Sequence, residues 1–483
     1  MASTRSTTGT FIVSLDIGSS SVRTLLYDEH AKVVSGFGKQ IAYDLATTSD
    51  GGVEIDPAML LDHCRECLTT IESELSEKGI RPAGIAVAGF WHSFLGVDAG
   101  GTPTTPVMHL LDTRSTLQVE WLKKRLDERA VHSRVGCVFH TSYWPARLLW
   151  LAENRPEACA KTKRWMSFGE YLALQLTQQS VESTSMMSAC GLWNFNQNDY
   201  DEALLSVLPI RRDQLFDPAA MDHLASRNGI PWFPAIGDGA ANNVGSGCVT
   251  SNRFALMVGT TGAMRNVIES DRVAISWGLW CYRIDRRRFV LGGALSDGGK
   301  VFEWMTERLA GLPEGEELER ALGDLAPGAH GLTFLPLFAG ERSPNWNAAA
   351  RAVIAGISLH TQPLDLLRAS LEAVALRFRL IYDLLVARAG EPVDVVATGG
   401  ALLRSRVWSQ MMADALGRPV IGSLESETSS RGAAMLALER LNVRPLADFE
   451  TALGEVFSPE PKHAALYAAM LARQKDLYAK LYP

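Results

Sequence analysis

Residues 11–29, FIVSLDIGSSSVRTLLYDE, contain the turn that decides the fold. An apolar strand is followed by a carboxylate at Asp16, then by Gly18 and three serines, and a second strand carries Arg23 near its start. A glycine lets the backbone approach a ligand closely, while backbone N–H groups, hydroxyls and a guanidinium all donate to anionic oxygens. The pattern predicts a phosphate-binding turn, although an ordinary hairpin with a Gly/Ser turn would also show it.

The residue types of this turn indicate which ligand groups each would hold. Candidate donors to phosphate oxygens are Ser19, Ser20, Ser21 and Arg23. Asp16 can only accept, so beside a polyphosphate it indicates a metal ion, and Mg²⁺ takes one or two carboxylates together with phosphate oxygens. The stretch matches neither G-x-x-x-x-G-K-[ST] nor G-x-G-x-x-G, so those nucleotide motifs do not apply.

A second copy of the pattern occurs at residues 254–268, FALMVGTTGAMRNVI. An apolar strand leads to a Gly/hydroxyl turn with Thr260 and Thr261, and Arg265 follows in the next strand. An internal repeat of this kind is a primary signal of architecture. Two lobes that each offer a phosphate-binding hairpin resemble the actin-like ATPases and the sugar kinases that share their fold. We therefore expect an α/β protein with two actin-like (ribonuclease H-like) ATPase domains facing each other across a cleft.

Length and composition set the outer bounds. The 483 residues exceed one hydrophobic core and suit two domains. The predicted division is an N-terminal domain at 1–250, a C-terminal domain at 251–440 and a helical extension at 441–483. A hydrophobic content of 47%, a charged content of 21% and a net charge of −7 without a basic stripe predict a globular enzyme with no nucleic-acid partner.

No membrane or export signal is evident in the sequence. The first ten residues have no apolar region behind a basic start, and no apolar run is long enough to span a bilayer. Seven cysteines, an odd number, fit reduced buried thiols better than a disulfide framework. Cys64 and Cys67 have C-x-x-C spacing but lie in a helical pattern without a second metal-binding pair. We expect a cytoplasmic protein with no membrane partner.

Three polar positions in the first half stand where a cleft ligand would be bound. The buried strand at 84–90 ends at Trp91 and His92, and strand ends facing a cleft are where α/β proteins place ligand groups. Asp112 follows in the stretch LDTRS. Asp238 stands at a strand-to-helix break between two glycines, which would present a catalytic carboxylate, although a plain N-cap aspartate would also fit.

Two glycine turns in the second half suit a nucleotide. Gly299 opens a helix after the strand in FVLGGALSDGGKVFEWM, where backbone N–H groups and the helix dipole favour anions. The Gly399–Gly400 turn lets a planar base and ribose lie flat against the backbone.

Assembled in order, these segments resemble the FGGY family of carbohydrate kinases over about residues 11–440. The matching strings are DIGSSSVR, WHS with LDTRS, IGDGAANNVGSG, VGTTGAMR, GERSPNWN and TGGALLRSRVWSQMMADALGRPV. The resemblance implies transfer of the ATP γ-phosphoryl group to a sugar hydroxyl, with Asp238 as general base and substrate ligand, His92 and Asp112 as further substrate ligands, and Arg404 near the adenosine. Relatives of this kind are often homodimers.

Within the family, HSFLGVDAGGTPTTP, GTTGAMR and GERSPNWNAAA look most like the gluconate kinase branch. Departures are FWH at 90–92, Thr261 where serine is commoner, and SSRGAA before the last helix; a bulky Trp91 could reshape the sugar pocket. A gluconate carboxylate needs a cation, and the candidates are Arg114, Arg265, Lys300 and Arg342. The alternatives left open are an FGGY kinase for xylulose, ribulose or a tetritol, an actin-like ATPase, and a non-catalytic sugar-binding protein.

Overall fold

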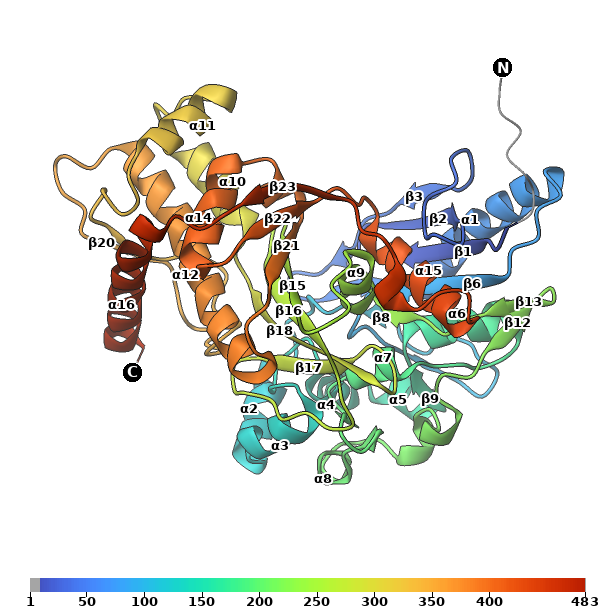
Figure 1. Cartoon of the computed structure of the whole chain (residues 1–483). Helices are drawn as coiled ribbons and strands as arrows, with labels where there is room; N and C mark the ends of the chain where they lie inside the picture. Colours follow the sequence, from blue (N-terminus) through green and yellow to red (C-terminus); the bar gives the residue numbers. More distant parts are fainter. Residues whose placement is uncertain (1–8, 483) are drawn as a thin grey trace, which may run out of the picture.

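The computed structural model describes residues 9–482, and its core consists of two mixed seven-stranded sheets (Figure 1). Residues 1–8, on which most of the expectation about the N-terminal segment rests, lie outside the described part. The first sheet contains β1 (Ile12–Ile17), β2 (Ser21–Tyr27), β3 (Gln40–Ala42), β6 (Gly84–Gly89), β12 (Ala225–Arg227), β13 (Ile230–Trp232) and β14 (Ile236–Gly237). The second contains β15 (Arg253–Val258), β16 (Gly262–Glu269), β17 (Trp280–Arg283), β18 (Arg288–Leu295), β21 (Asp394–Thr398), β22 (Val420–Ser423) and β23 (Leu453–Phe457).

The two sheets repeat one arrangement of strands. In the first, β1 pairs antiparallel with β2 and parallel with β6. In the second, β15 pairs antiparallel with β16 and parallel with β21. The predicted internal duplication is therefore confirmed at the level of topology. On the other side of β2, the three residues of β3 pair with it.

The remaining strands form small satellite sheets. They are β4 (Ala46–Thr47), β5 (Val53–Ile55), β7 (Leu95–Val97), β8 (Val107–Met108), β9 (Arg164–Met166), β10 (Trp193–Asn194), β11 (Asp199–Tyr200), β19 (Thr333–Leu335) and β20 (Val353–Ala355). The helices of the first half are α1 (Pro57–Glu77), α2 (Thr116–Arg125), α3 (Glu128–Val135), α4 (Trp144–Asn154), α5 (Pro156–Lys161), α6 (Phe168–Thr177), α7 (Thr184–Ser188), α8 (Glu202–Leu205) and α9 (Asp238–Gly245).

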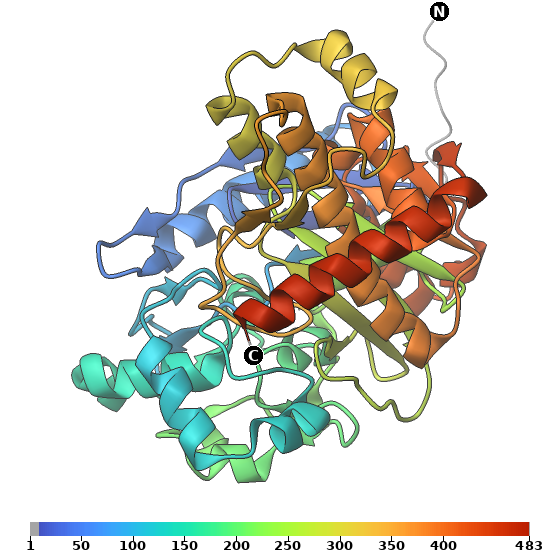
Figure 2. The same cartoon turned by 90° about the vertical axis from the view of Figure 1, so that its left-hand side faces the viewer.

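The helices of the second half are α10 (Gly299–Arg308), α11 (Gly315–Asp324), α12 (Pro363–Ala389), α13 (Gly400–Leu403), α14 (Arg406–Leu416), α15 (Thr428–Arg440) and α16 (Ala464–Leu481). The long helix α12 packs on β16 and β18, and α16 lies across α12, α14 and β19 on the outside of this half (Figure 2). Residues 441–483, predicted to be helical, also contain β23, which pairs with β22 at the edge of the second sheet.

Helix α15 belongs to the second half in sequence but packs on the first sheet. It contacts α9, β1 and β6, and the hydroxyl of Ser14 in β1 donates to the carbonyl oxygen of Ser430 at 2.9 Å. This helix therefore joins the end of the second half to the first sheet. Its small residues serve a close helix crossing, since a Cβ on Gly432 would overlap the carbonyl oxygen of Ala241, and one on Gly245 would overlap that of Thr428.

Gly432→Ala is expected to destabilise the protein strongly. The added methyl group would meet backbone atoms of α9, which cannot swing aside as a flexible side chain could. Overpacking in a close contact costs about 1–3 kcal/mol, and thermal unfolding measures the loss. Gly323→Ala in α11 is the matched control, because its nearest neighbour is a valine methyl carbon at 3.5 Å. Equal unfolding temperatures for the two variants would contradict the role of the crossing.

Two further findings concern the cysteines and the helices of residues 9–482. The seven cysteines are all free, and six of them are buried, as the sequence predicted. Among residues 9–482, no helix combines the length and the apolar character that crossing a bilayer requires.

Candidate active site

Three adjacent parallel strands end at the same edge of the first sheet. In β6, Ala88 is the register partner of Asp16 on one side and of Ile236 on the other, and Gly89 is the partner of Gly237. The carboxyl end of β1 therefore carries Asp16, β6 leads into the Trp91 segment, and β14 leads into Asp238 at the first position of α9. Strand connectivity alone brings the predicted metal ligand, sugar-side residues and general base together.

The two carboxylates lie close enough for the charge of Asp238 to raise the proton affinity of Asp16. Burial, and then the negative charge of Asp238, raise the pKa of Asp16 to about 7, against a smaller opposing effect of Arg23. Burial also raises the pKa of Asp238, while the backbone N–H of Gly239, which donates to Oδ1 at 2.7 Å, and the charge of Arg265 lower it. The site thus contains two neighbouring carboxylates, and the negative charge of Asp238 disfavours ionisation of Asp16.

The position of the Trp91 indole explains why glycines flank Asp238. A Cβ on Gly237 or on Gly239 would overlap the indole of Trp91, which donates from Nε1 to the carbonyl oxygen of Ser185 at 3.2 Å. The flanking glycines were predicted to leave the face of Asp238 open; in the structure they make room for this ring. The indole then packs edge-on against Trp280 and Tyr282 of β17.

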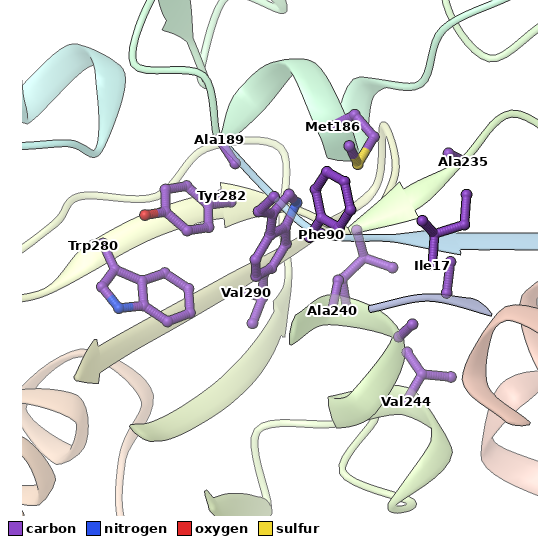
Figure 3. Packing of buried hydrophobic residues seen from close by; sticks show 14 of the residues in the cluster. Ile17, Phe90, Met186, Ala189, Ala235, Ala240, Val244, Trp280, Tyr282 and Val290 are labelled. Carbon is purple, nitrogen blue, oxygen red and sulfur yellow. The ribbon is translucent and has the colours of Figure 1, made fainter. Parts of the chain in front are cut away.

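The aromatic residues of β17 connect the two halves beneath the site, and the sequence analysis missed them. Figure 3 shows Trp280 and Tyr282 in one apolar cluster with Phe90, which follows β6, and with Ala240 of α9. Tyr282 donates to or accepts from Tyr143 of the first half at 2.6 Å. The alternating pattern of WCY in β17 is a signal that could have indicated a shared aromatic face.

Gly237→Ala is expected to lower both activity and stability, because the new methyl group and the Trp91 indole cannot occupy one place. A loss of about 1–3 kcal/mol is typical for such overpacking. The double variant Gly237→Ala/Trp91→Ala tests the cause: removing the ring should return part of the activity lost in the single variant. If steady-state rates and unfolding temperatures of the double variant fall below those of both single variants, the steric explanation is wrong.

His92 is held in one tautomer. Its φ of 69° is left-handed, its ring is buried, and Nδ1 lies 2.6 Å from the carbonyl oxygen of Ala189. Burial lowers the pKa of His92 to about 3, so the ring is neutral. A carbonyl only accepts, so Nδ1 must carry the proton and Nε2 has a free lone pair. His92 can therefore accept a hydrogen bond from a hydroxyl at Nε2.

Asp112 departs from its predicted contact with substrate. Its side chain is fully buried, Oδ2 accepts the backbone N–H of Val53 at 3.2 Å, and both oxygens accept from Arg114. Arg114 also pairs with Glu54 at 2.6 Å. No face of this carboxylate reaches a ligand, because its lone pairs are used within the protein. The expectation that Asp112 binds substrate hydroxyls is corrected to a structural role.

The first turn has the predicted shape and one unpredicted partner. The N–H of Gly18 donates to the carbonyl oxygen of Ser21 at 2.9 Å, which leaves Ser19 and Ser20 exposed at the tip. Arg23 stands opposite Asp16 in register, and its guanidinium forms an ion pair with Glu427. In this structure Arg23 is therefore partly neutralised, and a phosphate would compete with Glu427 for it.

The predicted nucleotide residues of the second half are brought together. The N–H groups of Gly298 and Lys300 donate to the carbonyl oxygen of Thr260 at 3.1 and 3.2 Å, and that of Gly299 donates to Gly259 at 2.7 Å. The side chains of Thr260 and Thr261 are exposed. The second turn and the start of α10 thus form one hydrogen-bonded unit.

The third part of this region is the glycine turn after β21. Gly399 has a φ of 90°, and a Cβ there would lie 2.5 Å from the carbonyl oxygen of Val258, directly before the second turn. The Arg404 guanidinium folds back beside Gly400. Asp297, which the sequence analysis did not single out, is buried at the edge of this region and its Oδ1 has no partner among the described residues.

The carboxylates fit a cation that arrives with phosphate. Within residues 9–482, no three His, Cys, Asp or Glu side chains gather into a metal site of their own. Mg²⁺ binds through one or two carboxylates plus phosphate oxygens and water. Asp16 and Asp238 could supply such ligands, since a divalent cation would offset both the burial and the repulsion that raise the pKa of Asp16.

Comparisons with known proteins agree with this geometry. Residues 11–221 match the N-terminal domain, and residues 254–439 the C-terminal domain, of the FGGY family of carbohydrate kinases. A gluconokinase of Bacillus subtilis (strain 168) is 27% identical over 451 residues, covering 89% of this chain and 87% of the relative.

Solved structures show the same fold over nearly the whole chain. A gluconate kinase from Lactobacillus acidophilus has a TM-score of 0.90 at 25% identity, with 98% of each chain covered. A ligand-bound xylulose kinase from Lactobacillus acidophilus has a TM-score of 0.89 at 25% identity, also with 98% of each chain covered. The predicted two-domain fold is confirmed.

Proposed function

The chain belongs to the FGGY family of carbohydrate kinases, phosphotransferases with an alcohol group as acceptor, and from this premise we propose that it phosphorylates D-gluconate with ATP and Mg²⁺. More generally, the acceptor is a small open-chain sugar acid or polyol. The choice of gluconate is supported by the similarity to gluconokinases in sequence and to a gluconate kinase in structure.

The observation that carries the proposal is the position of Asp238. It begins a helix at the carboxyl-end edge of the first sheet, beside Asp16, and α9 also contacts β16 of the second sheet. A single carboxylate therefore faces both the half with the sugar-side residues and the half with the nucleotide turns. Phosphoryl transfer requires little covalent chemistry from the protein, so positioning and charge neutralisation dominate.

In the proposed reaction, a hydroxyl oxygen of the acceptor forms a bond to the γ-phosphorus as the bond to the bridging β–γ oxygen breaks and ADP leaves. Asp238 accepts the proton of the attacking hydroxyl. The N–H of Gly239 orients its carboxylate. His92 accepts a hydrogen bond at Nε2 from another hydroxyl of the acceptor. This contact fixes the position of the acceptor's carbon chain relative to Asp238.

The phosphates are held by the two turns. Ser19, Ser20, Ser21 and Arg23 of the first turn and Thr260 and Thr261 of the second would donate to them, with Gly299, Gly400 and Arg404 beside the nucleotide. Bound Mg²⁺, held through Asp16, would neutralise charge on the transferred group. Closure of the two halves would exclude water, which otherwise competes with the acceptor.

A neutral ketose such as xylulose is the second candidate substrate, because the xylulose kinase structure is nearly as similar as the gluconate kinase structure. Ribulose and tetritols belong to the same class of neutral acceptors. For these substrates a cation in the pocket would have no partner.

The test is a panel of acceptors with MgATP, measured by ADP release. D-gluconate should give the highest kcat/KM, above xylulose, ribulose, tetritols and other aldonates. Acceptor-independent ADP release would indicate an ATPase, and no ADP release with any acceptor would contradict the proposed function.

A further inference from the structure

One face of the second sheet is directed at the sugar side of the site. Arg265 of β16 pairs in register with Gly292 of β18, and Gly292 with Trp280 of β17, so Arg265 and Trp280 share a face. That face meets the first half, because Trp91 packs against Trp280. The opposite face is covered by α12, since a Cβ on Gly293 would overlap Ile381.

Arg265 is buried in this interface without a partner. Only 8% of the residue is exposed, Nε and Nη1 are fully buried, and its guanidinium makes no hydrogen bond or ion pair within residues 9–482. Two other buried arginines, Arg147 and Arg431, each donate to several backbone carbonyl oxygens. A buried cation left unpaired is costly, so its retention indicates a ligand anion.

Arg342 supplies a second cation from the loop between β19 and β20. Its Nε is buried and also lacks a partner in the described part of the chain. Next to it, Ser343 is tied to the edge of β18, donating through its N–H to Ala294 at 2.9 Å and accepting the Ala294 N–H at 3.0 Å on its hydroxyl. The position of Arg342 is therefore fixed relative to the face that carries Arg265.

The C-terminal helix also holds this loop. Glu341, directly before Arg342, pairs with Arg377 of α12 and accepts a hydrogen bond from the hydroxyl of Tyr478 in α16. Trp346 further along the loop donates from Nε1 to the carbonyl oxygen of Gly278 at 3.3 Å. Three different elements thus pre-organise the loop, which is typical of a site that must keep a charged group in place.

The positive charge of Arg342 affects the pKa of Arg265 and that of His92. Burial and the charge of Arg342 lower the pKa of Arg265, while Asp238 raises it. Arg342 likewise contributes to the lowered pKa of His92. The surroundings of Asp238 and His92 therefore carry two positive charges, and Asp238 is the carboxylate that acts on Arg265.

The other two candidate cations are placed elsewhere. Arg114 is committed to Asp112 and Glu54, and Lys300 is exposed at the start of α10, on the nucleotide side. Of the four candidate cations, Arg265 and Arg342 thus remain available to a carboxylate on the sugar side.

We propose that Arg265 and Arg342 together bind the carboxylate of the acceptor and thereby select sugar acids over neutral sugars. This inference rests on the proposed function. Planar guanidinium groups suit carboxylates because they form paired, charge-assisted hydrogen bonds. Trp280, on the face of Arg265, and Tyr282 beside it lie on the sugar side, whereas the phosphates have the hydroxyls and N–H groups of the two turns.

Attachment of the acceptor at two points would make its rate of phosphorylation depend on the length of its carbon chain. Asp238 takes the attacking hydroxyl and the two arginines take the carboxylate, so an acceptor must span the gap between them. In a series of aldonates from three to seven carbons, kcat/KM should show one sharp maximum. A series with no length dependence would contradict two-point attachment.

The decisive experiment compares Arg265→Met and Arg342→Met with two acceptors of equal length, D-gluconate and the neutral D-glucitol. Each variant should raise the KM and the Kd for gluconate about 10- to 100-fold, as expected for losing a hydrogen bond to a charged group. Weak binding or turnover of glucitol and the KM for MgATP should change less than threefold. Arg265→Lys should recover part of the gluconate affinity.

Calorimetric titration without nucleotide makes the result independent of turnover. If Arg265→Met binds gluconate as the wild type does, or if it raises the KM for MgATP with every acceptor, the arginine serves another group and the proposal is wrong. If the wild type phosphorylates ketoses or polyols but neither binds nor phosphorylates any aldonate, the carboxylate site is wrong while the kinase function stands. If no acceptor is phosphorylated, the proposed function fails as well.

Thermal unfolding separates a ligand role from a structural one. Removing an unpaired buried charge should leave the unfolding temperature of Arg265→Met unchanged or raise it. A structural arginine would give a marked fall. Arg287→Met is the matched control, since Arg287 is an exposed residue paired with Glu269 on the surface, and its gluconate affinity and stability should equal those of the wild type.

Discussion

Asp238→Asn is expected to lower kcat by about 10²–10⁴-fold while leaving the Kd for ATP nearly unchanged. The amide has the size of the carboxylate and can still accept the Gly239 N–H, so the start of α9 should keep its shape. It cannot take a proton from the attacking hydroxyl. Single-turnover phosphorylation and nucleotide titration measure the two quantities separately.

The control for this variant is Asp476→Asn on the exposed face of α16, where the carboxylate pairs with Lys480. That variant should retain the kcat of the wild type. Turnover by Asp238→Asn within threefold of the wild type would remove Asp238 from the role of base. A large loss of ATP affinity would instead place Asp238 on the nucleotide.

Asp16→Asn is expected to abolish most activity and yet stabilise the ligand-free protein above neutral pH. Burial raises the pKa of Asp16 to about 7 from an ordinary 3.8. The folded protein therefore holds this proton more tightly than the unfolded chain, and the free energy of unfolding falls as pH rises from about 4 to 7. Asparagine has no such proton, so the variant should gain on the order of 2–4 kcal/mol relative to the wild type by pH 8.

Unfolding of both proteins in denaturant at pH 5 and at pH 8 tests this sign. The stability difference between variant and wild type should be larger at pH 8, and Mg²⁺-dependent ATP binding should be lost in the variant. Asp476→Asn, an exposed carboxylate, should show no such dependence. Parallel curves for Asp16→Asn and the wild type would show that the pKa of Asp16 is not raised in the folded protein.

Local sequence patterns were sufficient to predict the parts of the site that are built from contiguous residues. The hairpins at 11–29 and 254–268 pair as expected, and Asp238 begins a helix directly after a strand. The two-lobed fold followed from finding the same hairpin twice. Such features depend on turn chemistry and apolar periodicity, which are properties of short segments.

Features that depend on distant contacts could not be predicted. Asp112 and Arg114 are two residues apart in a motif that resembled a sugar site, but their saturation depends on Val53 and Glu54 from another strand. Trp91 looked like an obstacle in the sugar pocket, whereas it packs in the space left by two glycines about 150 residues later. That Arg265 and Arg342 lack partners among residues 9–482 becomes visible only once the contacts of the folded protein are known.

The packing of α15 on the first sheet limits how this polypeptide can be divided. Without that helix, a fragment ending near residue 250 would expose the buried faces of β1 and β6 and the groove of α9 to water. The complementary fragment would carry a helix with no surface to cover. Neither portion is then expected to fold on its own, and during biosynthesis the first sheet remains without its covering helix until more than 400 residues have been made.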